Sequence, residues 1–298
     1  MALVSMNLLW AIGYPVTAIA LHHGASASFL AVIRLAIAFF MLIPWLWHIK
    51  RWSWTLLGFS ACMGIIGISV PLWLQIIGLH ETNPAIAALS ISAEPVLTFI
   101  LASMLLGSKL TGAQRGAIVL AVVGSWVLTG EPRPTHALHV VGDGALFLAL
   151  VLFAAFNIYS PRLFQWVNAG PGAALTFGFG SLGSTILWLI EGTPLPHHVG
   201  LPLIASLGFM AIGATGAAYL LWLYVIGRQS VSYATLFLFT QPLVGTLLSW
   251  MLGQSRITLS IVIGGILIIT AMTLGHYGGR FEPRLDKSAE SSEHGVPL

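Results

Sequence analysis

The chain has 298 residues, of which 57% are hydrophobic and only 7% are charged. Soluble domains carry about 25% charged residues, so this composition excludes a soluble globular protein. The formal net charge of +3 is small and its basic residues are scattered, which argues against a nucleic-acid partner.

Long apolar runs, separated by polar or Gly/Pro-rich turns, recur along the chain. Each is long enough to cross a hydrocarbon core about 30 Å thick as a helix. We therefore predict an all-α polytopic membrane protein with ten transmembrane helices. The predicted spans are 3–22, 28–48, 54–79, 84–106, 113–130, 141–165, 172–191, 201–226, 231–252 and 257–277.

The first span has two interpretations. Residues 17–27, "TAIALHHGASA", resemble the end of a signal peptide. However, no basic segment precedes them and further spans follow, so we interpret residues 3–22 as a retained span.

Basic residues are distributed unequally between the two ends of the predicted spans. If the N-terminus defines the first side, that side carries Lys50, Arg51, Lys109, Arg115, Arg162, Arg228, Arg280, Arg284 and Lys287. The opposite side carries only Arg133 and Arg256. Because basic residues accumulate on the cytoplasmic side, we predict an inner-membrane protein with both termini in the cytoplasm.

The second half of the sequence resembles the first. "WLQIIGL" (73–79) matches "WLYVIGR" (222–228), and residues 92–111 match residues 239–258 without a gap. A repeat of five spans crosses the membrane an odd number of times, so its second copy is inverted, as in many transporters. The predicted units are a first repeat (1–130), a periplasmic connector (131–140), a second repeat (141–278) and a disordered cytoplasmic tail (279–298).

The fourth span contains "SAEP", in which a carboxylate is followed directly by a helix-breaking proline. A charge in mid-membrane costs about 2.5–3.5 kcal/mol on insertion scales, so Glu94 is expected to face the interior of the bundle. Ser90 and Thr98, four residues to either side, extend a polar stripe on the same helix face. Pro95 and its counterpart Pro242 are predicted to kink or open their helices and to act as hinges.

Three interpretations of Glu94 remain open: contact with a substrate or a coupling proton, a structural role, and an incidental neutral acid. The structural role includes an ion pair with Arg34, although Arg34 could instead extend towards the membrane surface. The second repeat keeps the proline but has Gln241 in place of the acid. A broken helix therefore does not require the charge, which favours a functional role.

Other polar and aromatic residues inside the spans are candidates for lining a central cavity. Amides can either line such a cavity or join helices by hydrogen bonds, and aromatic residues can either line it or pack in the core. The candidates are Asn7, Gln75, Asn157 and Gln241 among the amides, and Trp10, Tyr14, Tyr219 and Trp222 among the aromatic residues.

These features resemble the EamA-type family of the drug/metabolite transporter superfamily over nearly the whole chain. The matching residues are "LLWAIGYP" (8–15), Arg34, "EPVLTFILASMLLG" (94–107), Gly116 and Gly124. The resemblance implies ten helices in two inverted halves, a central cavity, and export of metabolites or drugs. The family often has a glutamate after the "LLG" step, where this chain has Ser108 and Gln254.

The sequence contains neither a paired nucleophile and base nor a nucleotide-binding loop, so we expect no enzyme activity, no cofactor and no metal. The expected function is secondary transport by alternating access, with a channel or a membrane-embedded enzyme as less favoured alternatives.

The candidate cavity lacks a basic cluster, which favours an amphiphilic amine over a phosphorylated substrate. An amino acid, particularly an aromatic one, is the first choice, and an organic cation or drug is the second. The resemblance to a family that includes aromatic amino-acid exporters favours the first. The expected partners are this small molecule, the lipid bilayer and a coupling proton, and a monomer is sufficient.

Overall fold

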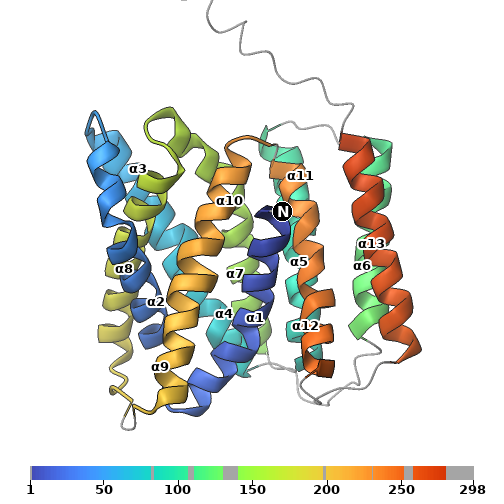
Figure 1. The fold of residues 1–298 in the computed structure, drawn as a ribbon, viewed down its shortest axis with the longest axis horizontal. Helices are drawn as coiled ribbons and strands as arrows, with labels where there is room; N and C mark the ends of the chain where they lie inside the picture. The colour runs from blue at the N-terminus through green and yellow to red at the C-terminus, as the bar shows by residue number, and fades with distance from the viewer. Residues whose placement is uncertain are drawn as a thin grey trace, which may run out of the picture.

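The computed structural model describes residues 2–81, 84–106, 111–129, 140–196, 199–229, 231–251 and 258–279. The regular elements of these residues are helices (Figure 1). Their bounds are α1 (Ala2–His22), α2 (Ala27–Leu42), η1 (Ile43–His48), α3 (Trp54–Gly64), η2 (Ile65–Ser69), α4 (Val70–Glu81), α5 (Pro84–Leu106), α6 (Gly112–Thr129), α7 (Val140–Tyr159), η3 (Ser160–Gln165), α8 (Ala169–Glu191), α9 (Leu201–Gly208), η4 (Phe209–Ala217), α10 (Ala218–Ile226), α11 (Val231–Leu236), η5 (Phe237–Phe239), α12 (Thr240–Met251) and α13 (Leu259–Gly279).

Where helical elements follow each other directly, their joined bounds lie close to the predicted spans. The largest difference is at the start of α8, at Ala169 instead of residue 172. The predicted connector and tail lie outside the described residues, apart from their boundary positions 140 and 279.

Polar side chains cap several helix starts. Ser26 Oγ accepts a hydrogen bond from Phe29 N at 3.2 Å, and Ser53 Oγ accepts one from Leu56 N at 3.1 Å. Before α6, Thr111 and Gln114 cap each other reciprocally, through Thr111 N to Gln114 Oε1 at 2.9 Å and Gln114 N to Thr111 Oγ1 at 3.2 Å. These bonds satisfy amides that have no partner within the helix.

Among the residues that the structure describes, six helical stretches are long and apolar enough to cross a membrane, as expected of a multi-pass membrane protein. They are Ala2–His22, Ala27–His48, Trp54–Gly78, Val141–Gln165, Ala169–Glu191 and Leu201–Ile226. Three shorter apolar helical stretches accompany them, at Ala93–Ala102, Gly112–Val127 and Leu259–Gly275.

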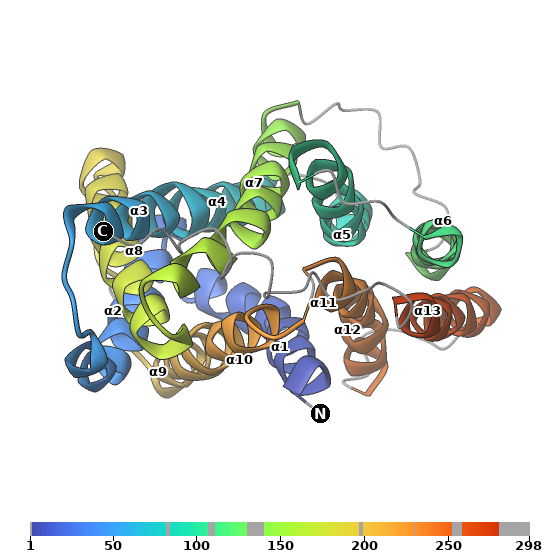
Figure 2. The same ribbon diagram turned by 90° about the horizontal axis from the view of Figure 1, so that it is seen from above.

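Helix contacts recur in matching pairs between the two halves of the chain. Helix α2 packs against α8, and α6 packs against α13. Helix α7 contacts α4 and α5, and in the same way α1 contacts α10 and α12. Viewed from above, α6 and α13 stand side by side at one end of the molecule, beyond α5 and α12 (Figure 2).

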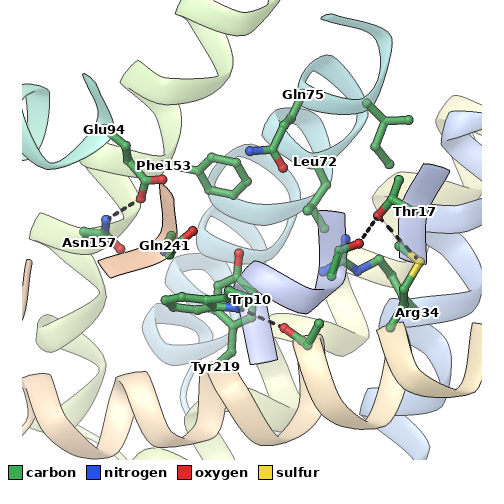
Figure 3. Close-up of a pocket in the computed structure, with 14 residues that line it drawn as sticks. Trp10, Thr17, Arg34, Leu72, Gln75, Glu94, Phe153, Asn157, Tyr219 and Gln241 are labelled. Atoms are coloured by element: carbon green, nitrogen blue, oxygen red, sulfur yellow. Dashed lines mark hydrogen bonds between the residues drawn. The ribbon is translucent and has the colours of Figure 1, made fainter. Parts of the chain in front are cut away.

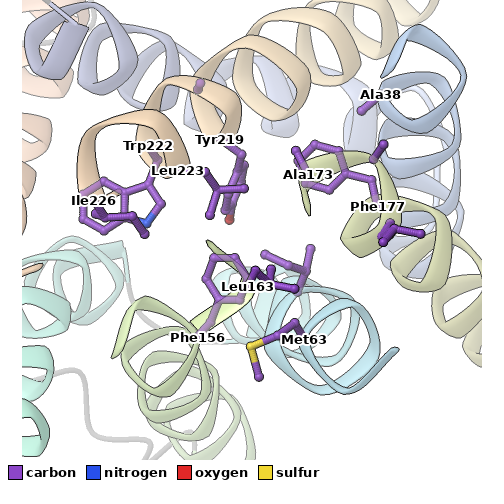
Figure 4. Packing of buried hydrophobic residues seen from close by; sticks show 14 of the residues in the cluster. Ala38, Met63, Phe156, Leu163, Ala173, Phe177, Tyr219, Trp222, Leu223 and Ile226 are labelled. Carbon is purple, nitrogen blue, oxygen red and sulfur yellow. The ribbon is translucent and has the colours of Figure 1, made fainter. Parts of the chain in front are cut away.

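The largest core cluster lies in the other part of the bundle, around the aromatic rings of α7, α8 and α10 (Figure 4). Tyr219 lies at its centre, with ring centroids 6.2 Å from Phe156 and 5.9 Å from Phe177, both in T-shaped geometry. Such edge-to-face contacts stabilise beyond the burial of apolar area. A smaller cluster, which includes Phe99, Ala121 and Ile268, joins α5 and η5 to the α6–α13 pair.

Two helices contain π-helical segments in the spans that the sequence repeat pairs with each other. Segment η2 lies between α3 and α4, and η4 lies between α9 and α10. A π-helical turn shifts the backbone hydrogen bonds by one residue and is frequent at functional sites. Both segments lead directly into residues that line the pocket described next.

Candidate functional site

A pocket lies between helices of both halves and encloses about 730 Å³ of space between atoms, including its open part (Figure 3). Its residues lie inside the joined helical stretches rather than at the ends of those stretches. They are Trp10, Gly13, Thr17, Arg34, Leu72, Gln75, Ile76, Glu94, Phe153, Asn157, Met210, Ala214, Tyr219 and Gln241.

Glu94 on α5 forms one side of this pocket. Asn157 on α7 donates from Nδ2 to Glu94 Oε1 at 3.2 Å, so a neutral amide holds the carboxyl group. Thr98, predicted to share a polar stripe with Glu94, is fully buried and donates to the main-chain oxygen of Glu94 at 3.0 Å. Thr98 therefore stabilises the backbone of α5 and does not line the pocket.

Gln241, the counterpart of Glu94 in the second half, also lines the pocket. Its Nε2 donates to Asn7 Oδ1 at 3.2 Å, and Asn7 Nδ2 donates to Leu3 O at 2.7 Å. Asn7 thus acts behind the pocket wall, where it orients Gln241. This contact joins α1 to α12 across 234 residues of sequence.

Aromatic rings form the middle of the pocket. The Trp10 and Tyr219 rings are 5.1 Å apart in T-shaped geometry. Trp10 Nε1 donates to Ala214 O at 2.9 Å, and Ala214 belongs to the π-helical segment η4. Trp222, predicted as a further wall residue, is fully buried behind Trp10 with ring centroids 5.9 Å apart. Its side chain belongs to the largest core cluster and does not line the pocket.

Arg34 on α2 forms the other side. Its Nε donates to Thr215 Oγ1 on η4 at 2.8 Å. Thr17 on α1 contacts the same segment, because its Oγ1 lies 3.7 Å from Met210 Sδ on η4 and donates to Gly13 O of its own helix at 2.8 Å. Figure 3 places Arg34 and Glu94 on opposite sides of the pocket, and they hydrogen-bond different residues, Thr215 for Arg34 and Asn157 for Glu94. Arg34 is only 8% exposed, so it does not extend to the protein surface.

The remaining predicted residues divide into two groups. Gln75 lines the pocket, whereas the side chains of Tyr14, Ser90 and Pro242 lie outside the described residues.

Helix α5 runs without interruption through Pro95, so it does not open there. In the other half, the three-residue η5 segment separates α11 from α12 shortly before Pro242. A hinge role for either proline stays a prediction.

Sequence reasoning missed several wall residues that helical spacing could have found. Thr17 follows Trp10 by seven residues and Phe153 precedes Asn157 by four, so each shares a helix face with a residue already chosen. Leu72, Ile76, Met210 and Ala214 are small or apolar. Nothing in their chemistry distinguished them from core residues.

An all-helical bundle that buries an acid, an arginine and amides around a pocket within apolar spans defines a membrane transporter. The model of the EamA-like transporter family matches residues 1–130 and 140–274. The chain belongs to the EamA-like transporter family.

Known proteins resemble the chain over most of its length. A protein of Archaeoglobus fulgidus named "Uncharacterized transporter" is 27% identical over 82% of this chain and 88% of its own length. A "Probable terminal-alkyne amino-acid exporter" of Streptantibioticus cattleyicolor is 25% identical over 92% of this chain and 94% of its own. A solved crystal structure with 21% identity superposes with a TM-score of 0.76, over 94% of this chain and 96% of that chain, and shows the same fold.

Proposed function

We propose that this protein is a secondary transporter that exports small amphiphilic metabolites, with amino acids as the substrate class. The observation that carries the proposal is the pocket in Figure 3, where a carboxyl group held by a neutral amide lies beside aromatic rings. The acid suits an ammonium group, and the rings of Trp10, Phe153 and Tyr219 suit an apolar, particularly an aromatic, side chain. The similarity to a probable amino-acid exporter supports the same class.

The proposed architecture is ten spans in two inverted repeats, one over residues 1–130 and one over 141–278. Three observations support it: the matches at 73–79 and 92–111 to the second half, the family match in two segments, and the matching helix contacts. An inverted repeat allows one half to move against the other, so that a central pocket faces each side of the membrane in turn.

Alternating access needs helices that change shape or move against each other. The π-helical segments η2 and η4 and the break before α12 are the proposed sites of this change. Transport would be coupled to a proton, proceed by substrate exchange or run downhill, since the sequence has no nucleotide-binding loop.

Substrate class is tested by uptake into proteoliposomes with a panel of labelled amino acids. We expect saturable uptake of at least one amino acid, inhibited by its unlabelled form. Saturable uptake of organic cations without any amino acid would indicate a drug exporter instead. A current that does not saturate would indicate a channel.

We also propose that the protein lies in the inner membrane with both termini in the cytoplasm. Cysteines introduced at Arg51 and Leu195 test this, in a background that carries Cys62→Ala because Cys62 is exposed. Both positions lie in connections between helices, at opposite ends of the predicted spans. An impermeant thiol reagent added to intact cells should label position 195 and not position 51. Labelling of both from outside would contradict the proposed topology.

A further inference from the structure

The aromatic side chains that line the pocket are those of Trp10, Phe153 and Tyr219, and they differ in their polar atoms. Trp10 Nε1 already donates to Ala214 O at 2.9 Å, and the Phe153 ring has no polar atom. The Tyr219 hydroxyl makes no hydrogen bond to any residue that the structure describes, although only 8% of Tyr219 is exposed. Figure 3 shows this hydroxyl pointing into the pocket beside the Trp10 ring.

The ring that carries the hydroxyl is held from three sides. It makes T-shaped contacts with Trp10 on α1, Phe156 on α7 and Phe177 on α8, at centroid distances of 5.1, 6.2 and 5.9 Å. These contacts fix the direction of the hydroxyl, but they involve only the ring. A phenylalanine at position 219 would make all three, so packing explains the ring of Tyr219 and does not explain its oxygen.

A buried polar group without a partner loses its hydrogen bonds to water and destabilises the protein, so nearly all such groups are paired and an exception needs an explanation. In a pocket, a ligand can supply the missing partner. A tyrosine hydroxyl both donates and accepts, which suits a neutral hydroxyl or amide group. A site that bonds a hydroxyl of its substrate also rejects the analogue without it, because the polar group of the site is then left unpaired.

We infer that Tyr219 selects substrates with a hydrogen-bonding group on an otherwise apolar side chain, so that a hydroxylated amino acid or amine binds in preference to its hydroxyl-free counterpart. This inference rests on the proposed function and deepens it. The proposed function places the ammonium group at Glu94 and the side chain against the rings of Trp10, Phe153 and Tyr219. Because the Tyr219 hydroxyl lies among these rings, it meets the side chain of the substrate.

The test compares ligands that differ by one hydroxyl group. The pairs are tyrosine with phenylalanine, tyramine with phenethylamine, and threonine with valine, in which a hydroxyl replaces a methyl group of similar size. Isothermal titration of the purified protein measures binding, and the readout is the ratio of the two affinities within a pair. This ratio does not depend on how much of a variant is folded. The tyramine pair has no carboxylate, so its ratio reports the side-chain hydroxyl alone.

In the wild type we expect the hydroxylated member of at least one pair to bind about threefold or more tightly, the value of a neutral hydrogen bond. Tyr219→Phe should bring this ratio close to one, because it removes only the hydroxyl and keeps the three ring contacts. Tyr224 supplies the matched control on the same helix. It is 47% exposed and lies outside the pocket lining, so Tyr224→Phe should keep the wild-type ratio.

Three results would overturn the inference. If the hydroxyl-free members bind as tightly in every pair, or if Tyr219→Phe keeps the wild-type ratio, Tyr219 contributes only its ring and the proposed function still stands. If Tyr219→Phe weakens both members of a pair equally, the hydroxyl contacts a part that the two ligands share, and the proposed function again stands. If no amino acid and no amine of the panel binds, both the inference and the proposed function fail.

Discussion

Replacing Glu94 by glutamine is expected to weaken the binding of an amine-bearing substrate by about 10- to 150-fold at any pH where the wild-type carboxyl group is ionised. The variant keeps the size of the side chain and reproduces Gln241 of the second half, but it removes the charge that the proposed function places beside the substrate's ammonium group. A lost hydrogen bond to a charged group costs about 1.5–3 kcal/mol, which corresponds to this range of affinity. Isothermal titration of the purified variant measures the effect.

The other roles of Glu94 lead to different results in the same experiment. If Glu94 carries a coupling proton, the variant should bind substrate normally but lose the pH dependence of transport. If Glu94 only holds α5 to α7 through Asn157, the variant should melt earlier and keep its activity per folded molecule. Glu191→Gln is the matched control, since it makes the same change at an exposed residue at the end of α8. Wild-type affinity and wild-type pH dependence in a stable Glu94→Gln variant would contradict every functional role.

Replacing Gly64 by alanine is expected to destabilise the fold strongly, because α3 and α8 cross at this residue. A Cβ at position 64 would collide with the main-chain oxygen of Thr176, and would lie 2.7 Å from Gly180 N and 2.9 Å from Phe179 Cβ. The first two atoms belong to the backbone, so no side-chain rotation relieves the contact and the helices must separate. Overpacking costs about 1–3 kcal/mol, and we expect a value at the upper end of that range.

Gly58 provides the control within the same helix. A Cβ at position 58 meets nothing within 4 Å, and alanine favours a helix over glycine by about 0.5–1 kcal/mol. Gly58→Ala should therefore keep or raise the melting temperature, and Gly64→Ala should lower it by several degrees, as followed by tryptophan fluorescence in detergent. Equal melting temperatures for the two variants would show that α3 and α8 are not in close contact.

The helices themselves could be predicted from local sequence. In a membrane every backbone polar group must be satisfied within the protein, so a long apolar run has few alternatives to a helix. Ser26, Ser53 and Thr111, which cap three helix starts, stand directly before such runs.

The candidate site was also partly predictable, because acids, arginines and amides inside a span are costly unless they face the interior. Glu94, Arg34, Gln75, Asn157 and Gln241 all line the pocket.

Only the tertiary structure decided which neighbour each of these side chains meets. The sequence left an ion pair between Arg34 and Glu94 open as one interpretation. In the structure Arg34 bonds Thr215, 181 residues away, and Glu94 bonds Asn157. Tyr219 lines the pocket whereas Trp222, one turn further along α10, is buried behind it. Lipid is as apolar as the side chains it surrounds, so hydrophobicity alone does not set the rotation of a helix about its axis. That rotation depends on close contacts between helices, such as Gly64 against Gly180, and these form only when segments distant in sequence are brought together.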